Sequence, residues 1–215
     1  SMNQWPLIWE QIKLLIYTAP ATLLAISAHE FAHGLVSYWL GDPTPKRDGR
    51  LSLNPLHHLD LVGTICMLVF RFGWAKPVKV NPQYYKNPKQ GMALTALAGP
   101  VMNLILAFLF LGIFVGLFHV TEGSTEGILG YLMLLAQYTA IMNIGLGVFN
   151  LIPIPPLDGS KVLGIFLPQR TYFQLMRYER YGGLLMIVLL YTGVLSRPLG
   201  ILRDGLLELM LRVWT

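Results

Sequence analysis

The longest apolar stretch of this chain runs from Gly91 to His119 and contains no Asp, Glu, Lys or Arg. An α-helix needs about 20 apolar residues to cross the hydrocarbon core of a bilayer, and this stretch exceeds that length. Of all residues, 54% are hydrophobic and 13% are charged, whereas soluble domains carry about 25% charged residues. The sequence therefore predicts an all-α polytopic membrane protein embedded in the lipid bilayer.

Two further stretches are expected to be membrane helices, from about Pro20 to Leu40 and from about Ile128 to Leu151. A separate interfacial or tilted helix is expected before Pro20, because Glu10 and Lys13 interrupt the apolar run there. The segment 61–72 is apolar but too short to span, which favours a re-entrant segment. The segment 161–183 is expected to be amphipathic and basic, and 184–195 to be apolar but short. The segment 199–214 is expected to be an interfacial helix.

Two short pieces between the predicted helices are expected to be strand-like loop elements. Leu51–Asn54 alternates apolar and polar residues, and prolines in the piece around Val78–Asn81 suit a sheet edge. They could form a small sheet at the membrane surface, or offer an edge to an unwound peptide. The sequence favours neither alternative. No internal repeat is visible, and residues 1–215 are expected to form a single membrane-embedded domain.

The basic residues predict how the chain is oriented. The net charge is +5, but Lys and Arg are spread over several loops, so nucleic acid is not expected as a partner. Membrane proteins carry an excess of Lys and Arg on their cytoplasmic loops. Residues 46–50, 76–89 and 161–180 are basic, whereas the turn with Glu122 and Glu126 is acidic. The basic loops are therefore expected to face the cytoplasm.

An HExxH motif, formed by His29, Glu30 and His33, lies inside the first predicted membrane helix. Positions four apart share a helix face, so both imidazoles can reach one metal ion. Zinc accepts neutral His nitrogens, and a catalytic zinc site keeps one position open for water. Glu30 could then take a proton from that water. Ionisable groups at membrane depth cost about 2.5–3.5 kcal/mol each, so a chance match is the weaker explanation.

Asp158 is the best candidate for the third protein ligand that a catalytic zinc ion needs. It follows the predicted helix that ends near Leu151, in a proline-rich stretch expected to fix its backbone. The predicted topology puts this helix end on the same membrane side as His33. Alternatively, Asp158 only caps a helix that begins near Ser160. The single cysteine, Cys66, excludes a cysteine-based zinc cluster.

Three motifs, in this order, resemble those of the site-2 protease family of intramembrane zinc metalloproteases. They are HExxH at 29–33, AGPxxN at 98–103 and NxxPxxPLDG at 150–159. Residues 53–60 and 73–78 are also similar to the short bacterial and archaeal members. In those members a proline often follows the aspartate of the first segment, whereas Leu61 stands here.

The resemblance implies a zinc metalloendopeptidase that cuts peptide bonds in or near transmembrane segments of single-span membrane-protein substrates. It assigns Zn2+ to His29, His33 and Asp158, and the role of general base to Glu30. It makes Asn150 a second catalytic residue, which steadies the substrate carbonyl or its oxyanion. The expected location is the cell membrane of a prokaryote, with the active site toward the cytoplasm.

Several assignments stay open at this level. Asn103 either supports a ligand or forms a hydrogen bond between helices in the bilayer. His57 and His58 are either functional or ordinary loop residues, and His119 is expected to be structural. A zinc-binding membrane scaffold or transporter without proteolytic activity is the alternative function, although the paired repeats of transporters are absent. The length leaves no room for PDZ or CBS domains, and homo-oligomer formation stays open.

Overall fold

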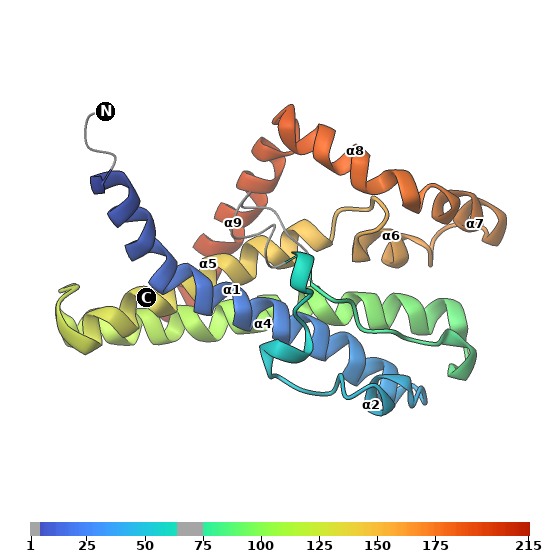
Figure 1. Cartoon of the computed structure of the whole chain (residues 1–215), viewed down its shortest axis with the longest axis horizontal. Helices are drawn as coiled ribbons and strands as arrows, with labels where there is room; N and C mark the ends of the chain where they lie inside the picture. Colours follow the sequence, from blue (N-terminus) through green and yellow to red (C-terminus); the bar gives the residue numbers. More distant parts are fainter. Residues whose placement is uncertain (1–4, 64–74) are drawn as a thin grey trace.

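The computed structural model describes residues 5–63 and 75–215 of the chain. Its centre consists of three long helices, α1 (Trp5–Trp39), α4 (Pro88–Thr121) and α5 (Gly127–Asn150) (Figure 1). The shorter elements are α2 (Thr44–Arg47), η1 (Pro55–His57), η2 (Pro82–Tyr84), α6 (Asp158–Leu163), α7 (Gln169–Arg177), α8 (Glu179–Tyr191) and α9 (Ser196–Trp214). The expectation of an all-α architecture is confirmed.

Helix α4 runs antiparallel to both α1 and α5. The side chain of Asn103 in α4 donates to the Ala25 carbonyl of α1 and to Asn143 of α5. At the far end of α4, the hydroxyl of Thr121 contacts the sulfur of Met133 near the start of α5. The C-terminal ends of α1 and α5 therefore lie at one end of the bundle, beside the N-terminal end of α4.

Within residues 5–63 and 75–215, three helices are long and apolar enough to cross a membrane, namely Ile12–Trp39 within α1, α4 and α5. The predicted separate helix before Pro20 is wrong, because α1 is continuous from Trp5 to Trp39 and Pro20 lies inside it. A proline within a helix removes one hydrogen bond and bends the axis, and α1 changes direction along its length (Figure 1). Glu10 and Lys13 stay on the helix surface as an ion pair of 2.9 Å.

Helices α8 and α9 meet at an 83° bend and together are apolar enough to form a broken span (Figure 1). Helix α9, which is expected at the interface over 199–214, packs against α4 and α5, and its interfacial position stays a prediction. At its end, the indole nitrogen of Trp214 donates to the Phe108 carbonyl over 3.0 Å. Its ring fills the space beside Gly112, where a Cβ atom would lie 2.7 Å away.

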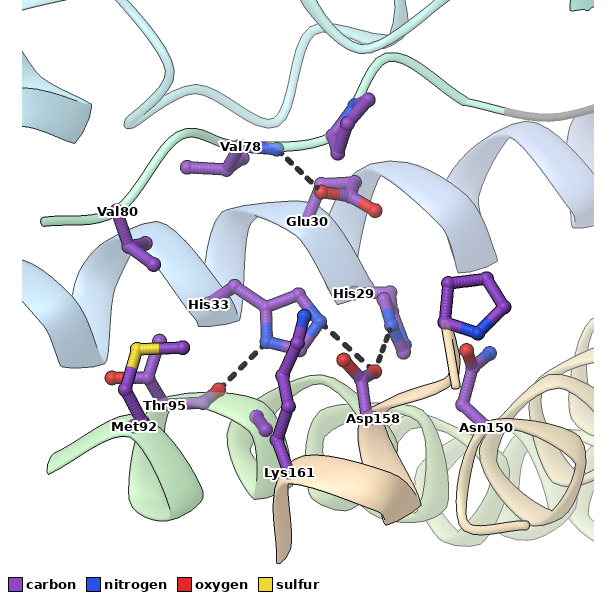
Figure 2. A pocket seen from close by; sticks show the side chains of 13 residues that line it. His29, Glu30, His33, Val78, Val80, Met92, Thr95, Asn150, Asp158 and Lys161 are labelled. Atoms are coloured by element: carbon purple, nitrogen blue, oxygen red, sulfur yellow. Dashed lines mark hydrogen bonds and ion pairs between the residues drawn. The ribbon is translucent and has the colours of Figure 1, made fainter. Parts of the chain in front are cut away.

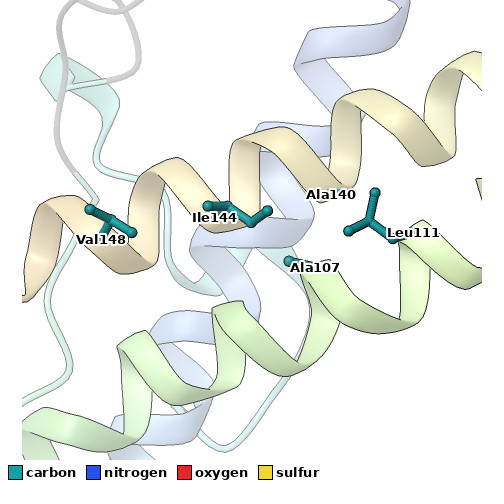
Figure 3. Close-up of a cluster of buried hydrophobic side chains, with 5 residues drawn as sticks. All are labelled: Ala107, Leu111, Ala140, Ile144 and Val148. Atoms are coloured by element: carbon teal, nitrogen blue, oxygen red, sulfur yellow. The ribbon is translucent and has the colours of Figure 1, made fainter. Parts of the chain in front are cut away.

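Small residues bring α4 and α5 close together in the apolar core. Ala107 and Ala140 are fully buried, and Leu111, Ile144 and Val148 complete the cluster (Figure 3). Small residues at helix contacts let backbones approach closely, which is the main source of packing energy in a bilayer. The opposite face of α4 exposes apolar side chains four residues apart, as a lipid-facing surface requires: Val101, Ile105, Leu109 and Ile113.

The two strand-like pieces form no strand in the described residues. Leu51–Asn54 pairs with no strand. The sheet-like pairing in the described residues is one isolated antiparallel bridge between Leu59 and Ala75. Val78–Asn81 is extended, but the Glu30 and Asp42 carboxylates bind its amides instead of a neighbouring strand. The predicted re-entrant segment, 61–72, lies mostly outside the described residues.

Candidate metal centre

Three side chains with metal-binding atoms converge between α1, α4 and α6. His29 and His33 project from α1, and Asp158 is the first residue of α6 (Figure 2). Their ligand atoms all lie within 4.8 Å of one another. Oδ2 of Asp158 lies 3.0 Å from Nε2 of His29 and 3.1 Å from Nε2 of His33. Ligands of a tetrahedral zinc ion are about 3.3–3.4 Å apart at bond lengths of about 2.0–2.1 Å, so this spacing suits one zinc ion.

A buried amide fixes the ring of His29. Nδ1 of His29 lies 2.6 Å from Oδ1 of Asn103. The amide nitrogen of Asn103 donates to the Ala25 carbonyl and to Asn143, so its oxygen is the acceptor for His29. The proton on Nδ1 is therefore donated to Asn103, and Nε2 is the ring nitrogen that faces Asp158 and can bind a metal ion. Asn103 therefore forms hydrogen bonds between helices and also orients His29, a candidate metal ligand.

The ring of His33 is fixed by a backbone carbonyl. Nδ1 of His33 lies 2.7 Å from the carbonyl oxygen of Thr95 and donates to it, which again leaves Nε2 for a metal. The Thr95 hydroxyl contacts the Tyr85 hydroxyl, which contacts Ser37, and Ser37 donates to the buried carboxylate of Asp42. A chain of hydrogen bonds thus connects His33 to the start of the loop after α1.

A tight turn places the Asp158 carboxylate. The next residue, Gly159, lies against the backbone of α5's end, where a Cβ atom would come within 2.2 Å of the Leu151 carbonyl oxygen. Asp158 is not the N-cap of α6, since that position is Leu157 and no side chain caps the helix. Burial alone would raise the pKa of the Asp158 carboxyl group, but hydrogen bonds with His29 and His33 outweigh it and lower this pKa. Asp158 is therefore a carboxylate, the form that binds metal.

Gly99 gives the two imidazole rings their space. A Cβ atom at this position would lie 2.6 Å from the His33 ring and 2.7 Å from the His29 ring. Gly99 and Asn103 are one helical turn apart on α4 and face the same pair of rings. The AGPxxN motif thus has a physical explanation, which the four-residue spacing of its glycine and asparagine could have suggested.

Glu30 and Asn150 border the same cavity, of about 180 Å³, as the three converging side chains. Oε2 of Glu30 accepts a hydrogen bond of 3.0 Å from the Val78 amide. The side-chain nitrogen of Asn150 donates to the Leu146 carbonyl of its own helix over 2.9 Å. The cavity is lined by His29, Glu30, His33, Pro77, Val78, Val80, Met92, Thr95, Ala96, Asn150, Pro156, Asp158 and Lys161.

The other histidines do not join this group. His58 is fully buried, and its Nε2 donates to the Ser52 carbonyl over 2.6 Å, which holds the loop after α2 together. His57 borders a separate cavity of about 390 Å³ with Arg50 and Lys76. His119 lies in the last turn of α4, at the other end of the bundle.

The fold and the donor set define a multi-pass membrane protein with a His–His–carboxylate group that could hold a metal ion. The family model described as Peptidase family M50 matches residues 116–192. "Putative zinc metalloprotease YwhC" of Bacillus subtilis is 37% identical over 209 residues, which are 94% of this chain and 94% of that protein. "Putative zinc metalloprotease Rip2" of Mycolicibacterium smegmatis is 32% identical over 86% of this chain and 71% of its own length.

"Zinc metalloprotease MJ0392" of Methanocaldococcus jannaschii is 32% identical over 114 residues, which are 52% of this chain and 31% of that protein. No solved structure matches. The chain belongs to peptidase family M50, the site-2 protease family, and the resemblance seen in its motifs is confirmed. It is a zinc metalloprotease with several membrane helices.

Proposed function

We propose that this metalloprotease is an intramembrane endopeptidase, which cuts single-span membrane proteins in or near their transmembrane segments. One observation carries the proposal: Glu30 borders the same cavity as His29, His33 and Asp158. Two of the three ligands and Glu30 belong to a helix long and apolar enough to span a bilayer. A peptide bond that reaches this cavity would be cut at membrane depth.

The ligand set and Glu30 suit hydrolysis by an activated water molecule. Bound zinc supplies a Lewis acid that lowers the pKa of a water ligand to about 7 and polarises a carbonyl group. Glu30 accepts a proton from the attacking water as its oxygen bonds to the scissile carbon. When the C–N bond breaks, Glu30 returns the proton to the leaving nitrogen, so the products are a carboxylate and an amine. The Val78 amide holds Oε2 of Glu30 and leaves Oε1 for this exchange.

The extended segment beside the cavity suits an unwound substrate. Val78 and Val80 border the cavity, and the amides of Lys79 and Val80 have no hydrogen-bond partner among the described residues. A transmembrane substrate has to leave its helix locally before its carbonyl can be attacked. Its freed backbone can pair with these amides, as peptides pair with exposed strand edges. Asn150 keeps its second amide hydrogen for the substrate carbonyl oxygen.

Replacing Glu30 by Gln tests the reaction directly. The amide keeps the shape of the side chain but cannot take the proton, so cleavage of a single-span substrate should fall about 10²–10⁴-fold. Zinc content should stay equal to wild type, and a zinc chelator should stop the wild-type protein. If the wild-type protein binds zinc but cleaves no single-span substrate in detergent or liposomes, the non-proteolytic scaffold or transporter is the better explanation.

We further propose a prokaryotic cell membrane location with the metal centre near the cytoplasmic face. His33 lies six residues before the end of α1, about 9 Å of helix rise. In a Cys66→Ser background, an impermeant thiol reagent should label Ser124→Cys in intact cells and should not label Gln83→Cys. Both positions are exposed and lie at opposite ends of α4. The reverse labelling pattern would show that the opposite orientation is correct.

A further inference from the structure

We propose that Lys161 is a further catalytic residue. Its ammonium group binds the negative charge that forms on the scissile carbonyl oxygen and remains on the product carboxylate. This inference rests on the proposed peptidase function and names a residue that the sequence motifs did not single out.

Lys161 borders the metal cavity because α6 presents it on the same face as Asp158. The two residues are three positions apart, which places their side chains on one side of a helix. Figure 2 shows the Lys161 side chain extending from α6 toward the two histidines, with its nitrogen at the tip. A peptide held between the ligands and Glu30 would therefore lie within reach of this ammonium group.

The ammonium group is not used by the protein itself. In the part of the chain that the structure describes, no ion pair or side-chain hydrogen bond involves Lys161. The two nearby carboxylates already have partners: Asp158 contacts His29 and His33, and Glu30 binds the Val78 amide. A lysine near a membrane surface usually extends its charge into water. Lys161 is instead half-buried and borders the cavity, where an unpaired charge is costly unless a ligand uses it.

Lys161 also supplies what the rest of the cavity lacks. Among the described residues that line the cavity, it is the one Lys or Arg side chain. Asn150, the residue expected to hold the oxyanion, spends one amide hydrogen on the Leu146 carbonyl. A positive charge in a partly dehydrated site stabilises a developing oxyanion more strongly than a neutral amide does. The geometry therefore divides the work, with Asn150 orienting the carbonyl group and Lys161 balancing its charge.

Steady-state kinetics on a single-span substrate test the charge of Lys161. Lys161→Met keeps a long side chain without charge and should lower kcat about 10²-fold, with KM changed much less. Lys161→Arg keeps the charge and should recover most of this loss. Lys86→Met is the matched control, since Lys86 is exposed and lies outside the cavity. Zinc content should be the same in all four proteins.

Binding of a cleavage product supplies a readout that needs no turnover. The amino-terminal product fragment ends in a free carboxylate, and the same peptide can be made with a terminal amide. The wild-type protein should bind the carboxylate form more tightly, as measured by fluorescence anisotropy with zinc-loaded protein. The Kd of the amide peptide divided by that of the carboxylate peptide should fall about tenfold in Lys161→Met. In Lys161→Arg this ratio should stay close to wild type. A purely structural lysine would weaken both peptides equally.

The outcomes separate this inference from the function on which it rests. If Lys161→Met has wild-type kcat and an unchanged Kd ratio while Glu30→Gln is inactive, the proposed peptidase function is supported and the role of Lys161 is refuted. If Lys161→Met and Lys161→Arg are equally impaired and both lose zinc, the lysine is structural and the proposal fails. If the wild-type protein binds zinc and cuts no membrane substrate, the proposed function itself fails.

Discussion

The contact between α4 and α5 has a buried pair of asparagines beside the metal centre and an apolar stretch toward the opposite end of the bundle. Near the ligands, Asn103 and Asn143 are both fully buried and bonded to one another, to α1 and to His29. One to two turns farther from the ligands, Ala107, Leu111 and Ala140 form an apolar contact (Figure 3). The same two helices thus use one half of their contact to hold ligands and the other to hold each other.

This difference teaches that ligand geometry and bundle stability are separable in this protein. In a bilayer, an unbonded polar group is costly, so polar side chains are kept where they have a complete set of partners. Apolar packing between small residues provides contact without directing any side chain. Changes in the polar half should therefore affect zinc binding first, and changes in the apolar half should affect unfolding first.

The largest effect on the metal is expected from Asp158→Ala. The variant loses one of three protein ligands and leaves the lone pairs of His29 and His33 without the carboxylate that completes the site. We expect it to lose stoichiometric zinc and all measurable cleavage, while it still folds because α4 and α5 keep their core. Metal analysis of the purified protein checks this. Full zinc retention would remove Asp158 from the site.

A smaller but clear effect is expected from Gly99→Ala. The added methyl group would lie 2.6 Å from the His33 ring and 2.7 Å from the His29 ring, so both rings have to move. Displacing ligands or their supports typically lowers metal affinity about 10–100-fold, and competition with a chelator measures it. Gly116→Ala, on the same helix, is the control. Apart from the backbone of its own helix turn, no atom of the described residues lies within 4 Å of the added Cβ atom. Equal zinc affinities in the two variants would contradict the contact.

In the apolar half, Leu111→Ala should destabilise the protein without changing zinc affinity. Leu111 is fully buried in the apolar cluster of α4 and α5, and truncating such a side chain to Ala typically costs about 2–5 kcal/mol. Reversible unfolding in mixed micelles measures the free energy, and chelator competition measures the affinity. A variant that keeps its stability but loses zinc would show that the two halves are coupled.

The smallest effect concerns how stability changes at acidic pH. It depends on Asp42, which lies at the end of the hydrogen-bond chain that leads to His33. Burial alone would raise the pKa of Asp42, but bonds from Thr44, Asn81 and Ser37 outweigh it and lower this pKa. The native protein therefore holds this proton more weakly than the unfolded chain does. The resulting stabilisation is complete above the ordinary value of about 3.9 and is lost as the pH falls below it.

Asp42→Asn should already lack this stabilisation at neutral pH, by about 1–3 kcal/mol, because it loses hydrogen bonds to a charged group. Its melting temperature should consequently fall less than that of wild type between pH 5 and 3, with zinc removed from both proteins beforehand. Parallel melting curves for the two proteins over this range would show that Asp42 does not contribute.

Local periodicity was enough to predict much of the fold and the positions of several site residues. Apolar length located α4 and α5 to within three residues at each end. The spacing of His29 and His33 placed both rings on one face, and the orientation of the helix ends placed Asp158 beside them. The catalytic roles of these residues, of Glu30 and of Asn150 remain predictions that the experiments above test.

The rest depended on contacts that a sequence pattern does not contain. Pro20 suggested a helix break, but membrane helices tolerate proline inside a continuous span. The sequence did not predict that the apolar face of α9 packs on α4 and α5 or that Trp214 fits beside Gly112. Lys161 looked like one basic residue among many until α6 placed it at the cavity. For α9 and Lys161, contacts with residues distant in sequence decided the outcome.

The side chain of Asn103 joins all three spans at a single level. Its nitrogen donates to Ala25 in α1 and to Asn143 in α5, and its oxygen accepts from His29. A helix that slid along its neighbours by one residue would move about 1.5 Å and break these bonds. The three spans therefore act as one rigid block. Room for an incoming peptide has to come from parts attached outside that block, such as the extended segment 77–81 or the bent α8–α9 arm.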